Sequence, residues 1–569
     1  MKSILRRLAL EPCIMFLLPL LVLLVLWAAL VRRGWDVRAA FLSAQVIQAV
    51  LVVFWTEVLG ACGALSALPM AAGWSVFLII SLVFMFSSRD RRSLAVAGAP
   101  WSAVEKALLA ASVCIAAVTG LLALLSPPNT CDAMSYHMAR VAHWAYNGTL
   151  ANYPTNTLRQ LVIQPYSEYA ILQTYVLSGS DRFANLVQWN AMASSLVGVS
   201  LAASLLGGGR FVQLCAVWFA ASFPMGILQA SSTQTDYVAA FWAVCSAVFA
   251  LLLARTQKRR WGVLLALAFG VAVFTKGTAV ILGGLFLLWG LSRSGWRSSH
   301  KCGLVLLSAG IVLALHAGFL VRMTQLSANP FSALSLGGSA MVQRVDVRAT
   351  LSNLIRGVAT GLATPWHGLN RAVLKVVAVG HQWLGIAPND PRFTLDGHEF
   401  MLAYLPNWED YATGLVHSIF FILVAIGIGV SAFLVAIRSR RQGPSGSGMS
   451  RTTELAGLRD MGLLISFSAV FFLAVLVFCA LVSWQEWIPR FQLPFFIIFS
   501  PVAAVAAGRF CRRAWLLGLG ICMAILAWTP LLYNKQCPLL PSGAVSRDQM
   551  AAQVKDGGTV FDWMQQNGY

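Results

Sequence analysis

Charged side chains are scarce in this chain of 569 residues: 11% are Asp, Glu, Lys or Arg, while 58% are hydrophobic. A soluble domain is usually about a quarter charged, so the composition excludes an ordinary water-soluble protein. Apolar runs of roughly 18 residues or more are typical of membrane-spanning helices, and they recur from residue 12 to residue 533. The chain is therefore predicted to be an all-α polytopic membrane protein with about 13 to 14 transmembrane helices. No small-residue cleavage site follows the first run, so we expect a membrane helix there and not a cleaved signal peptide.

Acidic residues are the rarer of the two signs, with 21 Asp and Glu against 41 Lys and Arg. The resulting charge of +20 does not indicate a nucleic-acid partner, because the basic residues cluster in short loops: 89–92, 255–260, 292–301, 438–451 and 509–513. Such loops are cytoplasmic by the positive-inside rule, and 438–451 also has the Gly, Ser and Pro of a flexible linker. The remaining loops are then extracytoplasmic, and they hold 14 of the 21 acidic residues: 127–182, 231–236, 323–412, 484–490 and the tail 534–569. Basic residues flank the first apolar run on both sides, so the side of the N-terminus stays undetermined.

Motifs for soluble cofactors are also missing. The eleven cysteines form no CxxC or Cys/His ligand spacing, and no GxGxxG or P-loop pattern is present. Cys131 and Cys537 both fall in predicted extracytoplasmic segments and could form a disulfide. We expect no cofactor and no resident metal, although a divalent ion is not excluded. Any substrate should reach the protein through the membrane or from the far side.

The predicted organisation follows from the spacing of the apolar runs. Five segments are expected: an N-terminal membrane segment of about three helices (1–102), a membrane core (103–322), a loop region (323–412), C-terminal helices (413–533) and a tail (534–569).

The first outer loop gathers polar residues where the chain leaves the membrane. Asp132 begins "DAMSYHMARVAHW", in which His137, Arg140 and Trp144 share one helical face, so an amphipathic interfacial helix is predicted. Asp132 could be a helix N-cap or a general base facing a pocket. Two arginines of this loop, Arg140 and Arg159, could anchor lipid headgroups or clamp a phosphate. His137 and Glu168 are further candidates near Asp132, with simple packing as the alternative for the histidine.

Three later segments place single charged residues at the ends of predicted helices. Asp236 follows a short outer turn and could be a helix N-cap or a supporting residue of a pocket that it shares with Asp132. The stretch 264–290 lies between two basic loops but is too short for two full crossings. We therefore predict two short helices that meet at 275–277, where Lys276 is a candidate functional residue or extends to the membrane surface. Arg490, after Pro489, could bind an anionic headgroup or anchor the interface.

Two acidic residues, Glu409 and Asp410, lie where the loop 323–412 returns to the membrane. Their position favours a solvated loop.

Taken in order, "DAMSYHMARVAHW", "TD", "AVFTKGTAV" and "RFQLP" resemble the GT-C superfamily of membrane glycosyltransferases. The branch most similar contains the protein O-mannosyltransferases and the lipid A aminoarabinose transferase. The resemblance implies a helical bundle with extracytoplasmic interfacial helices, in a bacterial inner membrane, that builds a cell-envelope glycan. The donor would be a sugar on a polyprenyl phosphate, and the acceptor is left open. Asp132 would be the base or the acceptor-orienting carboxylate, while Lys276 and Arg490 would approach the donor phosphate.

Two other classes share some of these features. A transporter or flippase of a lipid-linked saccharide would also need a charged cavity, but the sequence shows no internal repeat. For a non-catalytic scaffold, a lysine inside the membrane would be a cost without a use.

Overall fold

The computed structural model describes residues 15–87, 99–327, 345–441 and 451–540, together with Asn329 and Val342. Of the side chains, those of 435–436, 438–441 and 451–459 are not described. The basic stretch 89–92, the centre of the predicted linker and the tail beyond residue 540 lie outside these ranges.

The described chain is helical and contains no strand; one isolated bridge joins Thr394 to Trp484. Its first half comprises α3 (Leu17–Arg32), α4 (Val37–Ala61), α5 (Ala67–Phe86), α6 (Ala103–Leu125), the π-helix η1 (Ala133–His137), α7 (Met138–Asn147), α8 (Arg159–Val162), α9 (Tyr166–Ser178), the 3-10 helix η2 (Asp181–Phe183), α10 (Leu186–Leu205), α11 (Arg210–Ala221) and α12 (Pro224–Gln229). The second half comprises α13 (Asp236–Thr256), α14 (Arg259–Thr275), α15 (Ala279–Arg293), α16 (Ser298–Thr324), α18 (Val347–Gly361), α19 (His367–Leu384), α20 (Leu415–Arg441), α21 (Arg451–Leu481), α22 (Ile488–Phe510) and α23 (Arg513–Leu532).

Ten of the described helices are long and apolar enough to cross a membrane. Three shorter apolar helices, α3, α11 and α15, lie alongside them in the bundle. The prediction of an all-α polytopic membrane protein is thereby confirmed.

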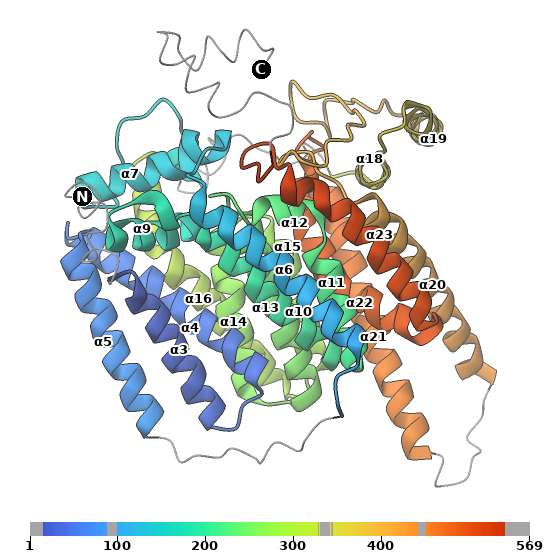
Figure 1. The fold of residues 1–569 in the computed structure, drawn as a ribbon, viewed down its shortest axis with the longest axis horizontal. Coiled ribbons are helices and arrows are strands. Elements are labelled where there is room, and N and C mark those ends of the chain that lie inside the picture. Colours follow the sequence, from blue (N-terminus) through green and yellow to red (C-terminus); the bar gives the residue numbers. More distant parts are fainter. Residues whose placement is uncertain are drawn as a thin grey trace.

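Different segments lie at the two ends of the bundle (Figure 1). At one end, the loops after α13 and α15 meet, since Gln257 accepts from the backbone N–H of Gly295 and its carbonyl accepts from Trp296. Arg255 at this end pairs with Asp460 of α21 at 2.6 Å. We call this end the basic face. The opposite end carries α7, α9, α18 and α19, and we call it the loop face.

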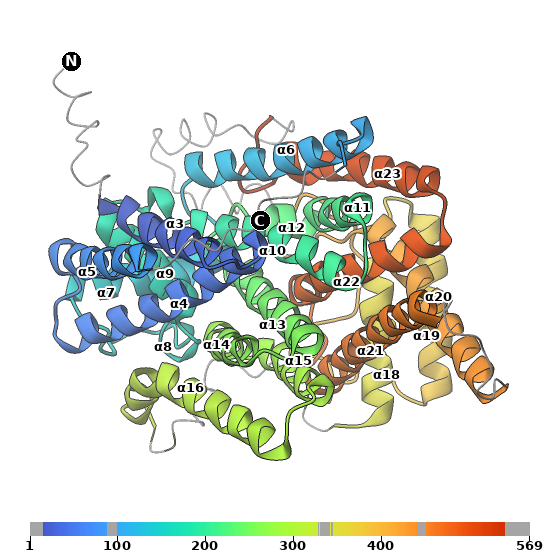
Figure 2. The same cartoon turned by 90° about the horizontal axis from the view of Figure 1, so that it is seen from below.

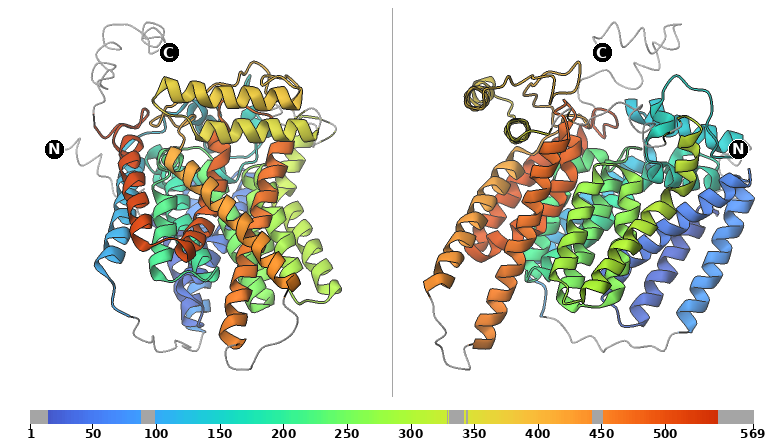
Figure 3. Two further views of the ribbon diagram at one scale, coloured as in Figure 1. Left: turned by 90° about the vertical axis from the view of Figure 1, so that its right-hand side faces the viewer. Right: turned by 180° about the vertical axis from the view of Figure 1, so that it is seen from behind.

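Helices α18 and α19 lie across the loop face, at a steep angle to the bundle helices (Figure 3). Both have one apolar and one polar side, and Trp366 and Trp383 are exposed on or beside them. Exposed tryptophans on amphipathic helices are typical of the membrane interface. The segment that follows α19 returns toward α22, because Leu395 and Trp484 are joined by a backbone hydrogen bond of 2.9 Å.

The N-terminal helices α3, α4 and α5 form a group at one side of the bundle (Figure 2). Phe16 stacks on Phe183 with ring centroids 4.2 Å apart, so α3 begins at the loop face. Near the same face, Arg322 of α16 makes a two-bond pair with Glu57 of α4, at 2.9 Å for each bond. The Tyr169 hydroxyl of α9 joins both groups. This cluster fastens the N-terminal group to the core.

Helix α13 forms the centre of the bundle, and every residue from Asp236 to Ala254 is buried. A helix that is apolar on all sides needs neighbours on all sides, and α10, α14, α15 and α22 surround it. Helices α14 and α15 have 17 and 15 residues. The predicted pair of short helices is therefore present. Lys276 lies at the break between them and contacts Asp236 at the N-terminal end of α13.

Candidate functional site

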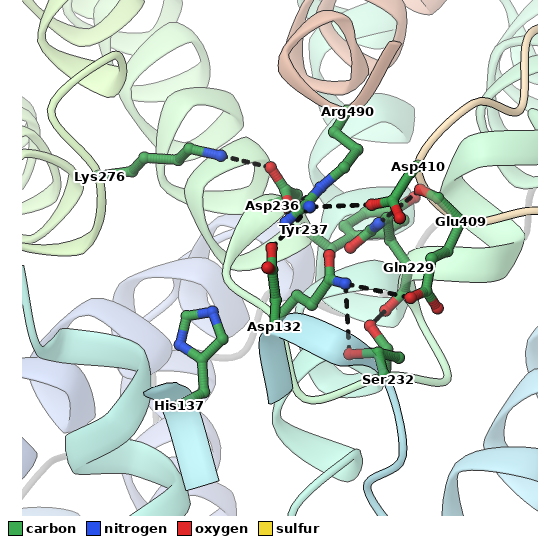
Figure 4. A network of polar contacts seen from close by, with 12 residues as sticks. Asp132, His137, Gln229, Ser232, Asp236, Tyr237, Lys276, Glu409, Asp410 and Arg490 are labelled. Carbon is green, nitrogen blue, oxygen red and sulfur yellow. Dashed lines mark hydrogen bonds and ion pairs between the residues drawn. The ribbon is translucent and has the colours of Figure 1, made fainter. Parts of the chain in front are cut away.

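Arg490 is the centre of a buried charged cluster near the loop face (Figure 4). It lies in the first turn of α22, directly after Pro489, and is 8% exposed. Its Nη1 donates to Asp132 at 2.7 Å and to Asp410 at 3.0 Å. Its Nε and Nη2 donate to Asp236 at 3.2 and 3.0 Å. A guanidinium has five N–H donors, so four of the five are used by carboxylates.

Asp132 reaches this centre because another residue caps its helix. Asp132 precedes η1, and its side chain makes no capping bond within the described chain. Thr130 makes the capping bond instead, since its hydroxyl oxygen accepts from the backbone N–H of Ala133 at 3.1 Å. The N-cap interpretation of Asp132 is therefore wrong for this structure, and its carboxylate is directed to Arg490.

Asp236 is arranged in the same way at the start of α13. Its side chain caps nothing in the described chain; Gln188 of α10 accepts from the N–H groups of Tyr237 and Val238 at 2.6 and 3.3 Å. The carboxylate of Asp236 is left to bridge two cations. One oxygen accepts from Lys276 and the other from Arg490.

Lys276 directly follows α14, and its side chain extends to the N-terminal end of α13. Among the described residues, Asp236 is the one hydrogen-bond partner of its ammonium group, which lies 4.2 Å from the centre of the Phe491 ring. The side chain is 20% exposed. Two of the three ammonium hydrogens are thus available to a ligand, which makes Lys276 a better donor to an incoming anion than Arg490.

The two acidic residues at the end of the large loop belong to the cluster, which corrects the expectation of a solvated loop. Asp410 pairs with Arg490, and Glu409 is 3% exposed beside Gln234. They approach because the segment 385–414 folds back onto the loop face. Sequence reasoning missed them because a "WED" next to an apolar run is also what an ordinary solvated loop end contains.

Burial and Arg490 set the protonation of this cluster. Burial alone would raise the pKa of Asp132, but the charge and the hydrogen bond of Arg490 outweigh it and hold that pKa below its usual range. Burial raises the pKa of Asp410 despite its contact with Arg490. Burial, together with the neighbouring Asp410 charge, raises the pKa of Glu409 to about 8. Glu409 therefore keeps its proton to a higher pH than Asp132 does.

The remaining residues predicted for the site lie around the centre rather than in it. His137 and Arg140 both contact the buried carboxylate of Glu168, at 2.8 and 3.5 Å. Arg140 is 1% exposed and also donates to the carbonyl of Leu161, so its fork is held inside the protein. Arg159 is exposed and lies 6.0 Å from the ring of Tyr136.

The possible disulfide between Cys131 and Cys537 is not formed in the described structure. Their segments nevertheless meet, because Asn129 donates to the carbonyl of Gln536 at 2.6 Å.

A large apolar cleft lies beside the charged cluster. It has an empty volume of about 970 Å³ and lies between α18, α20, α21 and α22. Phe478 and Phe495 line both this cleft and a smaller pocket that contains Asp236, Lys276 and Arg490. An amphipathic molecule could place its anionic head in the smaller pocket and its long apolar chain in the cleft.

Within the described chain, no group of three or more His, Cys, Asp or Glu side chains is arranged to hold a metal ion. Comparison of the chain with protein-family models, with curated proteins and with solved structures finds no match. The interpretation of the site therefore depends on its geometry.

Proposed function

We propose that the protein is a glycosyltransferase that moves a sugar from a polyprenyl-phosphate donor to an acceptor at the loop face. The loop face would be the extracytoplasmic side of a bacterial inner membrane. One observation carries the proposal. Four separate segments bring Asp132, Asp236, Lys276 and Arg490 to a single centre beside an apolar cleft.

The two cations supply what the leaving group needs. When the bond between the sugar and the phosphate breaks, negative charge develops on the polyprenyl phosphate, and fixed positive groups stabilise that charge. Lys276 has two free ammonium hydrogens for this role, and Arg490 has one remaining N–H. Asp236 keeps both cations in place, because one of its oxygens holds each of them.

Asp132 supplies the carboxylate for the acceptor. It is ionised and its side chain is 21% exposed, so it can accept a hydrogen bond from an acceptor hydroxyl. The acceptor oxygen then attacks the anomeric carbon, while the bond to the phosphate oxygen breaks and its electron pair leaves with the polyprenyl phosphate. A single displacement of this kind inverts the anomeric carbon.

The apolar cleft suits the polyprenyl chain. Most of its lining residues are apolar, and α21 and α22 contribute six phenylalanines: Phe471, Phe472, Phe478, Phe495, Phe496 and Phe499. Since the cleft adjoins Lys276 through Phe478 and Phe495, a chain bound there would present its phosphate to the cations.

The test uses purified protein in detergent with a panel of polyprenyl-phosphate monosaccharides and a small alcohol as acceptor. Release of polyprenyl phosphate together with a glycosylated alcohol is expected. Detergent solution has no second compartment, so a transporter or flippase would release neither product. Absence of both products with the whole panel would overturn the proposal.

A further inference from the structure

The π-helix η1 brings Asp132 and His137 onto the same side of the chain. Residues 133–137 form its single turn, with Asp132 directly before it and His137 at its end. Each turn of a π-helix closes a bond between residues five apart, and such turns are rare and often lie at functional sites. The wide turn returns His137 to the side from which Asp132 reaches Arg490.

His137 is held in one orientation by a buried carboxylate. Its Nδ1 lies 2.8 Å from Oε1 of Glu168, and the two side chains are 2% and 0% exposed. Burial would raise the pKa of Glu168, but the hydrogen bond from His137 and the charge of Arg140 hold it below its usual range. Glu168 is therefore an acceptor, so Nδ1 of His137 carries the hydrogen and donates it.

The other ring nitrogen of His137 is available. Nε2 has no hydrogen-bond partner among the described residues. Figure 4 shows the imidazole beside Asp132, with both side chains extending toward Lys276 and Arg490. In the neutral ring, Nε2 has a lone pair that can accept a proton.

Asp132 itself is poorly suited to keep a proton. The guanidinium of Arg490, at 2.7 Å, favours the ionised carboxylate. A carboxylate in this state can orient an acceptor hydroxyl, but the proton needs a more basic final acceptor.

We propose that His137, oriented by Glu168, is the final acceptor of this proton, while Asp132 orients the hydroxyl from which the proton comes. This rests on the proposed function. As the acceptor oxygen bonds to the anomeric carbon, its proton passes to Nε2 of His137. The bond from the anomeric carbon to the phosphate oxygen breaks, and its electron pair leaves with the polyprenyl phosphate. The imidazolium later returns the proton to water, and Glu168 stabilises it meanwhile.

The titratable and charged groups around His137 come from five elements. They are Asp132 and Tyr136 of its own helical segment, Arg140 of α7, Arg159 of α8, Glu168 of α9 and Arg490 of α22.

The test is the pH dependence of turnover in the full-length protein, measured as release of polyprenyl phosphate from the same donor panel. The variant His137→Asn keeps an N–H donor near the Nδ1 position for Glu168 but has no group at Nε2. We expect turnover to fall about a hundredfold, the usual scale for losing acid–base help. We also expect the acid limb of the wild-type profile to disappear, while donor KM and melting temperature stay close to wild type.

Two further variants separate a catalytic role from a structural one. Glu168→Gln keeps an oxygen that can accept from Nδ1 but removes the charge, so a shifted acid limb with a smaller loss of turnover is expected. His143→Asn is the matched control, since His143 lies on α7 and stacks on Tyr153 at 3.9 Å, away from Asp132. It should leave the profile unchanged.

A wild-type profile in His137→Asn would overturn this inference and leave the proposed function intact. An equal loss in His137→Asn and His143→Asn would also overturn it. Failure of the wild-type protein to release polyprenyl phosphate would instead remove the proposed function, and this inference with it.

Discussion

At the scale of single residues, two aspartates at the starts of helices can bind other groups because different side chains cap those helices. Thr130 satisfies a backbone N–H of η1, and Gln188 satisfies two at the start of α13. An aspartate that is not needed as a cap must be paired when it is buried. Asp132 and Asp236 are paired with Arg490 and Lys276, which places all four charges where a ligand can bind.

The first prediction concerns Asp132→Asn. Because Thr130 is the cap, we expect the melting temperature in detergent to stay close to wild type. An amide cannot attract the acceptor proton as a carboxylate does, so turnover should fall about a hundredfold or more. Release of polyprenyl phosphate measures the turnover.

Thr130→Ala is the companion to that variant. It should lower the stability by about 1 kcal/mol, the usual cost of a lost cap. Near-normal sugar transfer by Asp132→Asn would contradict the role given to its carboxylate.

The second prediction concerns Glu409. Its pKa is about 8 in the folded protein, against an ordinary value of 4.5. Between these values the folded state keeps a proton that the unfolded chain has released, so stability decreases as the pH rises through this window. In Glu409→Gln that decrease should be smaller, and the variant should melt above wild type near about pH 9.

Melting curves across the pH range check this, with Glu399→Gln as the control from an exposed carboxylate of the same loop. Parallel curves for wild type and Glu409→Gln would contradict the prediction.

At the scale of elements, the site is built from helix ends. The break between α14 and α15 delivers Lys276, the first turn of α22 delivers Arg490, and the loop before α20 delivers Asp410. Helices of 17 and 15 residues end before a full crossing. Their break therefore lies inside the protein, where Asp236 satisfies the ammonium.

The third prediction compares the two cations. Lys276→Met leaves Asp236 paired with Arg490, so the protein should still fold, and its affinity for polyprenyl phosphate should decrease. Arg490→Lys breaks the planar fork that holds three carboxylates. It should lower the melting temperature, because a lysine has three donors on one nitrogen and cannot reproduce the four bonds of the guanidinium.

Melting temperature and binding of polyprenyl phosphate in detergent distinguish the two effects. Lys258→Met, at an exposed position on the basic face, is the control for the loss of one positive charge. Wild-type affinity in Lys276→Met would show that this lysine does not bind the phosphate.

At the scale of the whole molecule, basic loops and the charged cluster lie toward opposite ends of the bundle. The basic loops 255–260 and 292–301 meet at one end, and the charged cluster lies near the loop face at the other (Figure 1). If the basic face is cytoplasmic, the site faces the extracytoplasmic side.

The fourth prediction follows from this arrangement. Single cysteines placed in 255–260 and 292–301 should react with a membrane-impermeant thiol reagent only after the cells are opened. Single cysteines in 127–182 and in the exposed part of 345–412 should react in intact cells. Background labelling is removed by first replacing the exposed native cysteines. Labelling of 345–412 only in opened cells would reverse the proposed orientation of the site.

The sequence alone determined the fold class of the protein and pointed to several residues of the charged cluster. Long apolar runs predict membrane helices because the bilayer offers no partner for unpaired backbone groups, so this conclusion needs no tertiary contacts. The short pair of helices around Lys276 could be predicted from length alone. Asp132, Asp236 and Arg490 could be singled out because an ionisable residue at the membrane is rare and costly.

Only the tertiary structure decided which of these charges meet. Arg490 lies 358 residues from Asp132 and 254 from Asp236 along the chain, and no local pattern encodes such contacts. Glu409 and Asp410 entered the site because the segment after α19 folds back, while Arg140 turned inward to Glu168. The local sequence at the start of a helix is the same whether its own aspartate or a distant glutamine caps it. The difference lies in packing between helices, which sets the partner of each buried charge.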